Sequence, residues 1–333
     1  MSQFRLLADD LTGALDSAAR FVGRLGAIPV VWQISPDLPS LAIDSATRDA
    51  DATTCRKIMF SRAPALAGAD LAFKKLDSLL RGHVVLEISC CVLATAFDHA
   101  IVAPAFPFQG RITRHGRQIA HGRDVGVDLR ADLGATLCRP GDAAPAGVSL
   151  WDAETDADLD AVVAAGRRLN GRVLWCGTAG LAGALAGHAR PPCPALPRPI
   201  LALIGSDHPA ARAQLDACPR RVTIAGAKAV SGGAVDVAVP PGLSRTEAAR
   251  HIAENFAALL RRIDPPGTCV VAGGETLRSL CDELGATRLD VDGELEPGVP
   301  TSRMVGGALD GMRIVSKSGA FGDAGFLARL LTG

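Results

Sequence analysis

The fold of this chain is decided by the stretch Leu6-Leu7-Ala8-Asp9-Asp10-Leu11-Thr12-Gly13-Ala14. Its apolar start predicts a strand, and the apolar side chains from Ala14 to Val22 recur at helical spacing. In an open α/β sheet, ligands bind at the carboxyl ends of the strands, where both acids would lie. An alternative interpretation is that Asp10 caps the helix. A cap needs only one acid, so Asp9 requires another explanation.

The alternation of short apolar runs with longer helical segments continues along the chain. The runs expected as strands are Phe4 to Ala8, Ile28 to Gln33, Leu71 to Lys75, His99 to Ala103, Arg172 to Cys176, Ile200 to Ile204, Thr268 to Ala272 and Arg313 to Ser316. This rhythm is typical of parallel strands joined by helical crossovers. We therefore predict an α/β protein with two domains, each with a mainly parallel sheet flanked by helices.

Proline density marks the expected division between these domains. Residues 188–199 carry prolines that block both helices and central strands, so they predict a linker between a domain at 1–190 and a domain at 199–333. The region from Gly110 to Val148 is rich in Gly, Arg and Asp and shows little periodicity. It is expected to be a long loop or lid region with a little local structure.

Composition excludes several classes of function. Hydrophobic residues make up 48% of the chain, and Lys+Arg and Asp+Glu both number 35, so a broad basic face for nucleic acid is disfavoured. No apolar run approaches the roughly 18 residues of a membrane span, and no signal peptide is evident, which predicts a cytoplasmic protein. The 9 cysteines form no C-x-x-C pair, so neither a zinc ribbon nor a disulfide framework is expected.

Charged residues also follow the other expected strand ends of the first half. In the segment Lys74 to Gly82, a helix is predicted to begin near Asp77 or Ser78, with Arg81 about one turn inside it. A guanidinium near a helix N-terminus favours an anionic ligand, although a solvated charged helix start is an equal alternative. Arg111 follows another strand on a loop fixed by Pro and Gly. Acids suited to hydroxyls and cations suited to a carboxylate together favour a hydroxylated acid as the ligand.

The second half carries three similar turns between strand and helix. They are Gly205-Ser206-Asp207-His208-Pro209, Gly273-Gly274-Glu275-Thr276 and Lys317-Ser318-Gly319-Ala320-Phe321-Gly322-Asp323. Glycine lets the backbone approach a phosphate, and Lys317 could neutralise one, although a single such turn is more often only a turn. No P-loop run, metal-binding histidine spacing or nucleophile elbow is present. The classes of function that remain are a small-molecule kinase and a nucleotide-linked binding protein.

These residues resemble the four-carbon acid sugar kinase family, formerly a domain of unknown function. The resemblance rests on seven motifs in the family's order: Ala8 to Ala14, Lys75 to Gly82, Pro104 to Pro107 with Gly110-Arg111, Gly177 to Ala182, Gly205-Ser206, Gly273 to Thr276 and Lys317 to Gly322. It implies an N-terminal acid-sugar domain and a C-terminal nucleotide domain. ATP would phosphorylate the terminal hydroxyl of a tetronate or a 3-oxo-tetronate, threonate and erythronate being open alternatives.

The resemblance also assigns site residues. On the substrate side it implies Asp9, Asp10, Lys75, Asp77, Ser78, Arg81 and Arg111, and on the ATP side it implies Ser206, Gly273, Gly274, Glu275, Thr276, Lys317, Gly319 and Gly322. Our mechanistic hypothesis is in-line phosphoryl transfer, in which Mg²⁺ and Lys317 offset phosphoryl charge and Asp10, or next Asp77, accepts the hydroxyl proton. The sequence identifies no metal ligands, and a homodimer is left open.

The chain departs from the family pattern on the substrate side. Leu79 replaces a usual Thr, His83 replaces a usual Asn, and the region 110–148 is shortened. A catalytically weak binding or regulatory protein with the same two-domain shell is therefore the alternative function.

Overall fold

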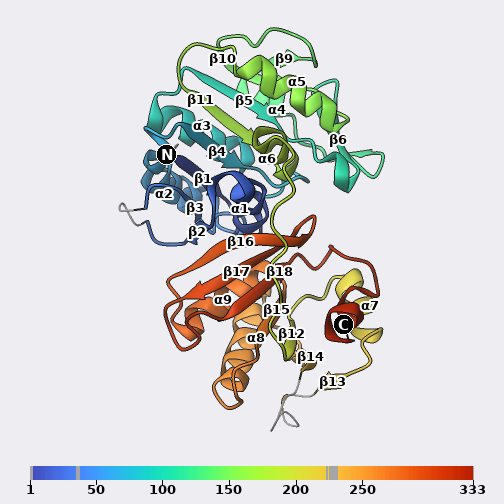
Figure 1. Cartoon of the computed structure of the whole chain (residues 1–333). Helices are drawn as coiled ribbons and strands as arrows, with labels where there is room; N and C mark the ends of the chain where they lie inside the picture. The colour runs from blue at the N-terminus through green and yellow to red at the C-terminus, as the bar shows by residue number, and fades with distance from the viewer. Residues whose placement is uncertain (1–2, 35–37, 223, 225–231, 333) are drawn as a thin grey trace. The chain divides into compact units, whose positions relative to one another are not determined.

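The computed structural model describes residues 3–34, 38–222, 224 and 232–332, and these form two compact units (Figure 1). The first unit runs from Met1 to Arg190 and the second from Pro191 to Gly333. Among the helices of these described ranges, none combines the length and the apolar character needed to cross a membrane.

The first unit is built on a parallel sheet with the strand order β2-β3-β1-β4-β11-β5-β10-β9. Its strands are β1 (Phe4–Ala8), β2 (Ile28–Val31), β3 (Leu41–Asp44), β4 (Leu71–Lys75), β5 (His99–Ala103), β9 (Thr136–Cys138), β10 (Gly147–Trp151) and β11 (Val173–Gly177). Its helices are α1 (Leu11–Leu25), α2 (Ala52–Arg62), α3 (Val84–Thr95), α4 (Leu129–Leu133), α5 (Asp156–Gly166) and α6 (Ala179–Ala186), with short 3₁₀ turns η1 (Ala63–Leu66) and η2 (Pro107–Gln109).

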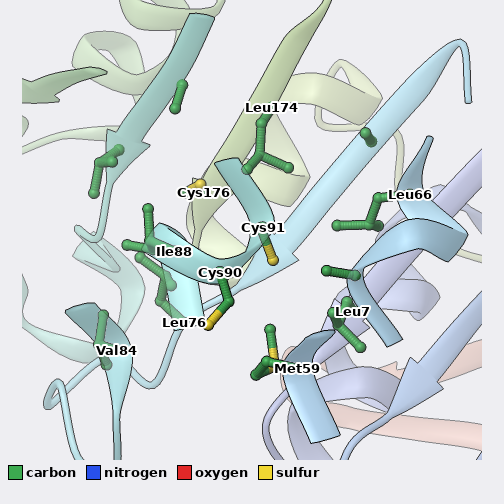
Figure 2. Close-up of a cluster of buried hydrophobic side chains, with 14 of the residues drawn as sticks. Leu7, Met59, Leu66, Leu76, Val84, Ile88, Cys90, Cys91, Leu174 and Cys176 are labelled. Atoms are coloured by element: carbon green, nitrogen blue, oxygen red, sulfur yellow. The ribbon is translucent and has the colours of Figure 1, made fainter. Parts of the chain in front are cut away.

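Helices cover both faces of this sheet. On one face, α6 packs between α1 and α5, and the rings of Phe4 and Phe21 lie 4.6 Å apart. Helices α2, α3 and α4 cover the other face, and their apolar side chains pack with Leu7 and Leu174 in one core cluster (Figure 2). All five residues of β1 are buried, as expected for a strand covered on both sides.

The second unit has the strand order β13-β14-β12-β15-β18-β17-β16. The strands β12 (Ile200–Ile204), β13 (Arg221–Val222), β14 (Gly233–Asp236), β15 (Thr268–Ala272) and β18 (Arg313–Lys317) are parallel, whereas β17 (Val299–Val305) and β16 (Arg288–Glu296) join as antiparallel strands. Helices α7 (Pro209–Asp216) and α10 (Phe326–Thr332) pack into one core cluster, and α8 (Arg245–Leu260) packs on α9 (Gly274–Leu284). The predicted fold class, an α/β protein with mainly parallel sheets flanked by helices, is confirmed.

Two expectations about local structure are wrong. The region 110–148 is not a long loop: it contains β6 (Arg111–Arg114), β7 (Arg117–Ala120) and β8 (Arg123–Asp124), which form an antiparallel sheet, followed by α4 and β9. The short strands and the five-residue helix are too brief to produce a clear periodicity, so the sequence conceals them.

The helix expected from Asp77 or Ser78 begins instead at Val84. Positive φ angles at Leu80 (55°) and Gly82 (79°) are incompatible with a helix there. The segment between β4 and α3 is consequently a tight loop, and Arg81 lies on that loop rather than on a helix.

The proline-rich segment packs on the second unit from Pro191 onward. The backbone N–H of Glu294 donates to Pro192 O at 2.9 Å, and Thr268 Oγ1 donates to Pro197 O at 2.8 Å. These bonds fix residues 191–199 along the second unit, so the segment has a defined course rather than that of a free tether.

Candidate functional site

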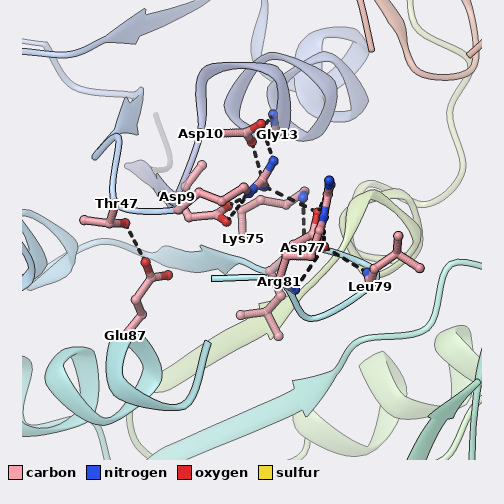
Figure 3. A network of polar contacts seen from close by, with 12 residues as sticks. Asp9, Asp10, Gly13, Thr47, Lys75, Asp77, Leu79, Arg81 and Glu87 are labelled. Atoms are coloured by element: carbon pink, nitrogen blue, oxygen red, sulfur yellow. Dashed lines mark hydrogen bonds and ion pairs between the residues drawn. The ribbon is translucent and has the colours of Figure 1, made fainter. Parts of the chain in front are cut away.

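Three carboxylates of the first unit converge on Arg48. They belong to Asp9, Asp10 and Asp77, which Figure 3 labels. Asp9 and Asp10 follow β1, and Arg48 follows β3, its parallel neighbour. Arg48 Nε donates to Asp9 Oδ2 at 2.7 Å and Nη2 donates to Asp9 Oδ1 at 2.9 Å, a bidentate pair. Arg48 Nη1 donates to Asp10 Oδ2 at 2.5 Å, and Nη2 lies 3.5 Å from Asp77 Oδ1. The guanidinium therefore joins all three acids.

The two adjacent acids have different roles. Asp10 is the N-cap of α1: its Oδ1 accepts the Gly13 N–H at 2.8 Å. A Cβ on residue 13 would lie 2.7 Å from this oxygen and 3.1 Å from Lys75 Nζ, so only glycine admits the arrangement. Asp9, whose side chain is 3% exposed, makes no cap and serves Arg48 instead.

The acids also differ in their electrostatics. Burial raises the pKa of Asp9, but the charges of Arg48, Lys74 and Lys75 outweigh burial and leave that pKa below its usual range. The pKa of Asp10 is raised, because burial and the neighbouring Asp9 charge outweigh Arg48. Asp10, at 24% side-chain exposure, is thus the member of the pair better suited to accept a proton.

Asp77 organises the loop after β4. Its Oδ2 accepts the backbone N–H groups of Leu79 and Arg81, both at 3.1 Å, and its carboxylate also holds the Arg81 guanidinium, with Nη2 2.7 Å from Oδ1. Although burial opposes ionisation, these bonds and Arg48 hold the pKa of Asp77 well below its usual range. Asp77 is therefore an ionised anchor. Because Leu79 contributes a backbone N–H, its departure from the family pattern leaves this anchor intact.

The adjacent lysines at the end of β4 serve opposite faces of the sheet. Lys75 lies against Gly13 of α1 and donates to Leu76 O at 2.7 Å. Lys74 extends to α3, where its Nζ lies 2.7 Å from Glu87 Oε2. Alternation along a strand separates them, so Lys75 alone of the two lies on the α1 side.

Arg111 reaches the loop after β4 from a different part of the chain. It starts β6, and its Nη1 donates to Ser78 Oγ. Gln118, on β7, donates to Ser78 O at 3.0 Å and to Pro104 O at 3.1 Å, so the small antiparallel sheet is tied to this loop. Burial lowers the pKa of Arg111, and its Nε has no hydrogen-bond partner.

The structure thus brings the sequence-predicted residues of the first unit into one polar cluster: Asp9, Asp10, Lys75, Asp77, Ser78, Arg81 and Arg111. Sequence reasoning missed Arg48, which connects the acids. The available signal was the polar run Ser45 to Arg48 after a short apolar segment, the same strand-end pattern that identified Asp9.

In the second unit, Lys317 is a buried cation at the end of β18. Lys317 is 1% exposed, and among the residues that the structure describes its Nζ has no hydrogen-bond partner. Burial lowers its pKa to about 8. A buried amine without a partner is costly, so this position favours an anionic ligand that would accept its hydrogen bonds.

Glycines allow the turns around Lys317 to pack closely. A Cβ at Gly319 would lie 2.0 Å from Ser206 Oγ, and one at Gly205 would lie 2.2 Å from Thr276 Oγ1. Gly273 has φ 115°, a conformation that favours glycine, and its N–H donates to Lys317 O at 3.1 Å. The three turns predicted from sequence therefore lie side by side at the carboxyl ends of β12, β15 and β18.

The loop after Lys317 is fixed by Gln214 of α7. Gln214 Nε2 donates to the carbonyl oxygens of Phe321 and Gly322, both at 2.9 Å. The remaining sequence-predicted residues of this unit are Gly274, Glu275 and Thr276, which form the first turn of α9. Backbone N–H groups at the start of this helix suit an anion beside Lys317.

Within the described ranges, no group of three or more His, Cys, Asp or Glu side chains is arranged to hold a metal ion. The carboxylate oxygens of Asp9, Asp10 and Asp77 accept hydrogen bonds from Arg48, Arg81 and backbone N–H groups.

Each of the two units matches a known protein family. Residues 4–132 match the family described as "Sugar-binding N-terminal domain", and residues 234–327 match "Nucleotide-binding C-terminal domain". The chain is 30% identical to a D-threonate kinase of Cupriavidus necator, over 96% of this chain and 94% of that protein. It is 25% identical to a D-erythronate kinase of Heliobacterium modesticaldum, over 97% and 95%.

Two solved structures superpose on the fold of this chain. A Haemophilus influenzae protein of a family described as DUF1537 superposes with a TM-score of 0.70 at 17% identity, covering 97% of this chain and 98% of that one. A Bordetella bronchiseptica protein of the same description, a domain-swapped dimer with bound citrate, superposes with a TM-score of 0.50 at 26% identity, covering 99% and 97%.

Proposed function

The chain belongs to the four-carbon acid sugar kinase family, a group of phosphotransferases that act on an alcohol group of a sugar acid, and we propose that it uses ATP with Mg²⁺ to phosphorylate the terminal hydroxyl of a four-carbon sugar acid. Threonate, erythronate and the 3-oxo-tetronates are the substrates to compare, since the relatives' names include both threonate and erythronate. The first unit would bind the acid and the second would bind ATP.

The observation that carries this proposal is the buried, unpartnered amine of Lys317 among three glycine turns. When bound, Mg²⁺ would supply further charge neutralisation for the transferring phosphoryl group, with Glu275 of the α9 first turn as a nearby carboxylate. Backbone N–H groups of the turns at Ser206, Gly273 and Gly319 would donate to the phosphates. Lys317 would donate to phosphate oxygens and offset their charge.

In the first unit, the cations would hold the carboxylate of the sugar acid and the acids would hold its hydroxyls. Arg81, with a side chain 54% exposed, and Arg111, with an unpartnered Nε, are the guanidiniums available to a ligand carboxylate. Asp10 would accept the proton of the attacking hydroxyl, because its pKa is raised whereas that of Asp77 is lowered.

A kinase that draws on ATP fits the cytoplasm, where we propose that it acts. A homodimer is the assembly to test, because the Bordetella bronchiseptica relative forms a domain-swapped dimer. The alternative remains a catalytically weak binding protein, for which the departures at Leu79 and His83 are the motive; here Leu79 donates its backbone N–H to Asp77, and His83 Nε2 lies 2.6 Å from Ala50 O.

The test is release of ADP on incubation with ATP, Mg²⁺ and a panel of four-carbon sugar acids, with ³¹P NMR to locate the ester. Asp10→Asn should lower kcat by about 10²-fold or more, whereas Asp77→Asn should mainly raise KM and loosen the loop. An unchanged kcat in the Asp10 variant would contradict the assignment of the base. ATP binding without turnover of any acid would favour the binding-protein alternative.

A further inference from the structure

A buried ion pair lies beneath the acid cluster, on the face of the sheet opposite Lys75. The Nζ of Lys74 is 2.7 Å from Oε2 of Glu87, and their side chains are 0% and 2% exposed. Lys74 Nζ also donates to Lys75 O at 2.9 Å. Because desolvation of two charges offsets much of their attraction, stability alone is a weak reason for such a pair. The other contacts of Glu87 show what it does.

The second carboxylate oxygen of Glu87, Oε1, connects the ion pair to the residues around Arg48. Thr47 Oγ1 donates to Glu87 Oε1 at 2.5 Å (Figure 3). Thr47 Oγ1 also lies 2.8 Å from Ser45 Oγ, which donates to Ala8 O at 2.7 Å. All of these groups are buried. Each hydroxyl carries one proton, which Thr47 gives to Glu87 Oε1 and Ser45 gives to Ala8 O, so these buried polar groups lie in a row from the ion pair to the end of β1, which Asp9 follows.

Thr47 immediately precedes Arg48, so its position governs that of the guanidinium. The backbone N–H groups of Thr47 and Arg48 donate to Asp9 O at 3.0 Å and 3.3 Å. The turn is thus fixed by its backbone to β1 and by the Thr47 side chain to α3. Without the bond to Glu87, rotation of the turn would move the long Arg48 side chain relative to Asp9 and Asp10.

We propose that Glu87 is a positioning residue, which through Thr47 holds the turn that aims Arg48 at Asp9 and Asp10, while Lys74 holds Glu87 in place. The catalytic consequence rests on the proposed kinase function, but the positioning itself concerns only this chain. Arg48 sets the ionisation of the acids, so a loosened turn changes the chemistry of the site and not only its stability.

The electrostatic consequence follows from the groups that surround Arg48 and Glu87. The charged or titratable groups facing them are Asp9, Asp10, Lys74, Lys75, Asp77, Arg81, Cys55, Cys90 and Cys91. Arg48 lowers the pKa of Asp9, Asp10 and Asp77 alike. Displacement of the guanidinium therefore raises the pKa of each acid. The acid limb of the pH profile of kcat/KM, where activity rises as the acids ionise, then moves to higher pH.

The central experiment compares Thr47→Val with Thr47→Ser in the full chain. Valine removes the hydroxyl with little change of shape, whereas serine keeps it. Thr47→Val should lower kcat/KM for the sugar acid by about 10- to 100-fold, as for a misplaced site group, and move the acid limb upward. Thr47→Ser should restore both values. The matched control is Thr95→Val, which removes a buried hydroxyl of α3 that bonds only to Cys91 O and should leave the limb in place.

A second pair of variants separates positioning from ion pairing. Lys74→Met/Glu87→Gln removes both charges but keeps an oxygen for Thr47, whereas Lys74→Met/Glu87→Leu removes that acceptor as well. Both variants lose the contact with Lys74, so the glutamine variant should retain clearly more of the turnover than the leucine variant, at similar melting temperatures. Equal turnover in both, or an unmoved acid limb in Thr47→Val, would overturn the proposal.

A measurement that does not depend on turnover tests the position of Arg48 separately from the kinase proposal. In ¹⁵N spectra, the Arg48 Nε–H should be protected from solvent exchange, since it donates to Asp9, and Arg48→Lys identifies the signal by its loss. Thr47→Val should remove the protection, and Thr95→Val should keep it. Protection that survives in Thr47→Val refutes positioning, whereas absence of kinase activity in the wild type refutes only the proposed function.

Discussion

Replacement of Lys317 by methionine should stabilise the second unit while it removes ATP binding. Burial lowers the pKa of Lys317 from 10.5 to about 8, a difference of about 2.5, and each pKa unit corresponds to about 1.36 kcal/mol. The charged lysine thus costs the folded state about 3 kcal/mol at pH 7. Methionine fills similar space without a charge, so the variant should gain free energy of unfolding of about that size.

The sign of the pH dependence follows from the lowered pKa. Between pH 8 and pH 10.5 the unfolded chain holds the proton that the folded chain has lost, so stability of the wild type rises with pH in that window. The methionine variant has no such dependence. The gap between the two proteins should therefore shrink from about 3 kcal/mol at pH 7 to about 1 kcal/mol at pH 10.

The assay is urea unfolding at pH 7 and pH 10, followed by a signal that comes from the second unit. The 3 tryptophans of the chain, Trp32, Trp151 and Trp175, all belong to the first unit, so their fluorescence does not report on Lys317. Hydrogen exchange of the β15 and β18 amides reports on it directly. A variant that is less stable at pH 7, or a gap that is equal at both pH values, would refute the reasoning. ATP binding that survives the change would separately refute the phosphate site.

Two further predictions concern Arg48 and the glycine turns. Arg48→Met should cost about 3–5 kcal/mol at pH 7, because it leaves buried carboxylates unpaired. Loss of the Arg48 charge should raise the pKa of these acids in the variant, so the cost should fall at pH 4, where they protonate more readily. Urea unfolding at the two pH values measures this, and an equal cost would contradict it. Gly319→Ala should weaken ATP binding at least about tenfold by calorimetry, since its Cβ would lie 2.0 Å from Ser206 Oγ. Gly183→Ala, whose Cβ would have its nearest neighbour at 3.8 Å, is the control, and equal effects of the two changes would exclude the steric explanation.

Local patterns predicted the strands well. Seven expected strands are found with the same first and last residues or within one residue, among them Phe4–Ala8 and Thr268–Ala272. The strand expected at Ile28 to Gln33 ends two residues earlier, at Val31. Buried parallel strands are continuous apolar runs, and such runs are visible in the sequence whatever the rest of the chain does.

The loop after β4 shows where local patterns fail. Asp77 and Ser78 are good caps followed by apolar residues, so the sequence indicated a helix start. In the structure Asp77 instead accepts two loop N–H groups and pairs with Arg81 and Arg48. Its role as an anchor depends on Arg48, which follows another strand.

By itself, the sequence determined the α/β class, the strand ends that carry Asp9, Asp10 and Lys75, and the glycine turns around Lys317. These features follow from periodicity and from backbone conformations that are encoded within a few residues. Only the tertiary structure decided that Arg48 joins the acids, that Lys74 and Lys75 part to opposite faces, and that Lys317 has no partner. Ionisation and hydrogen bonding depend on groups distant in the chain, and the fold alone determines which of them meet.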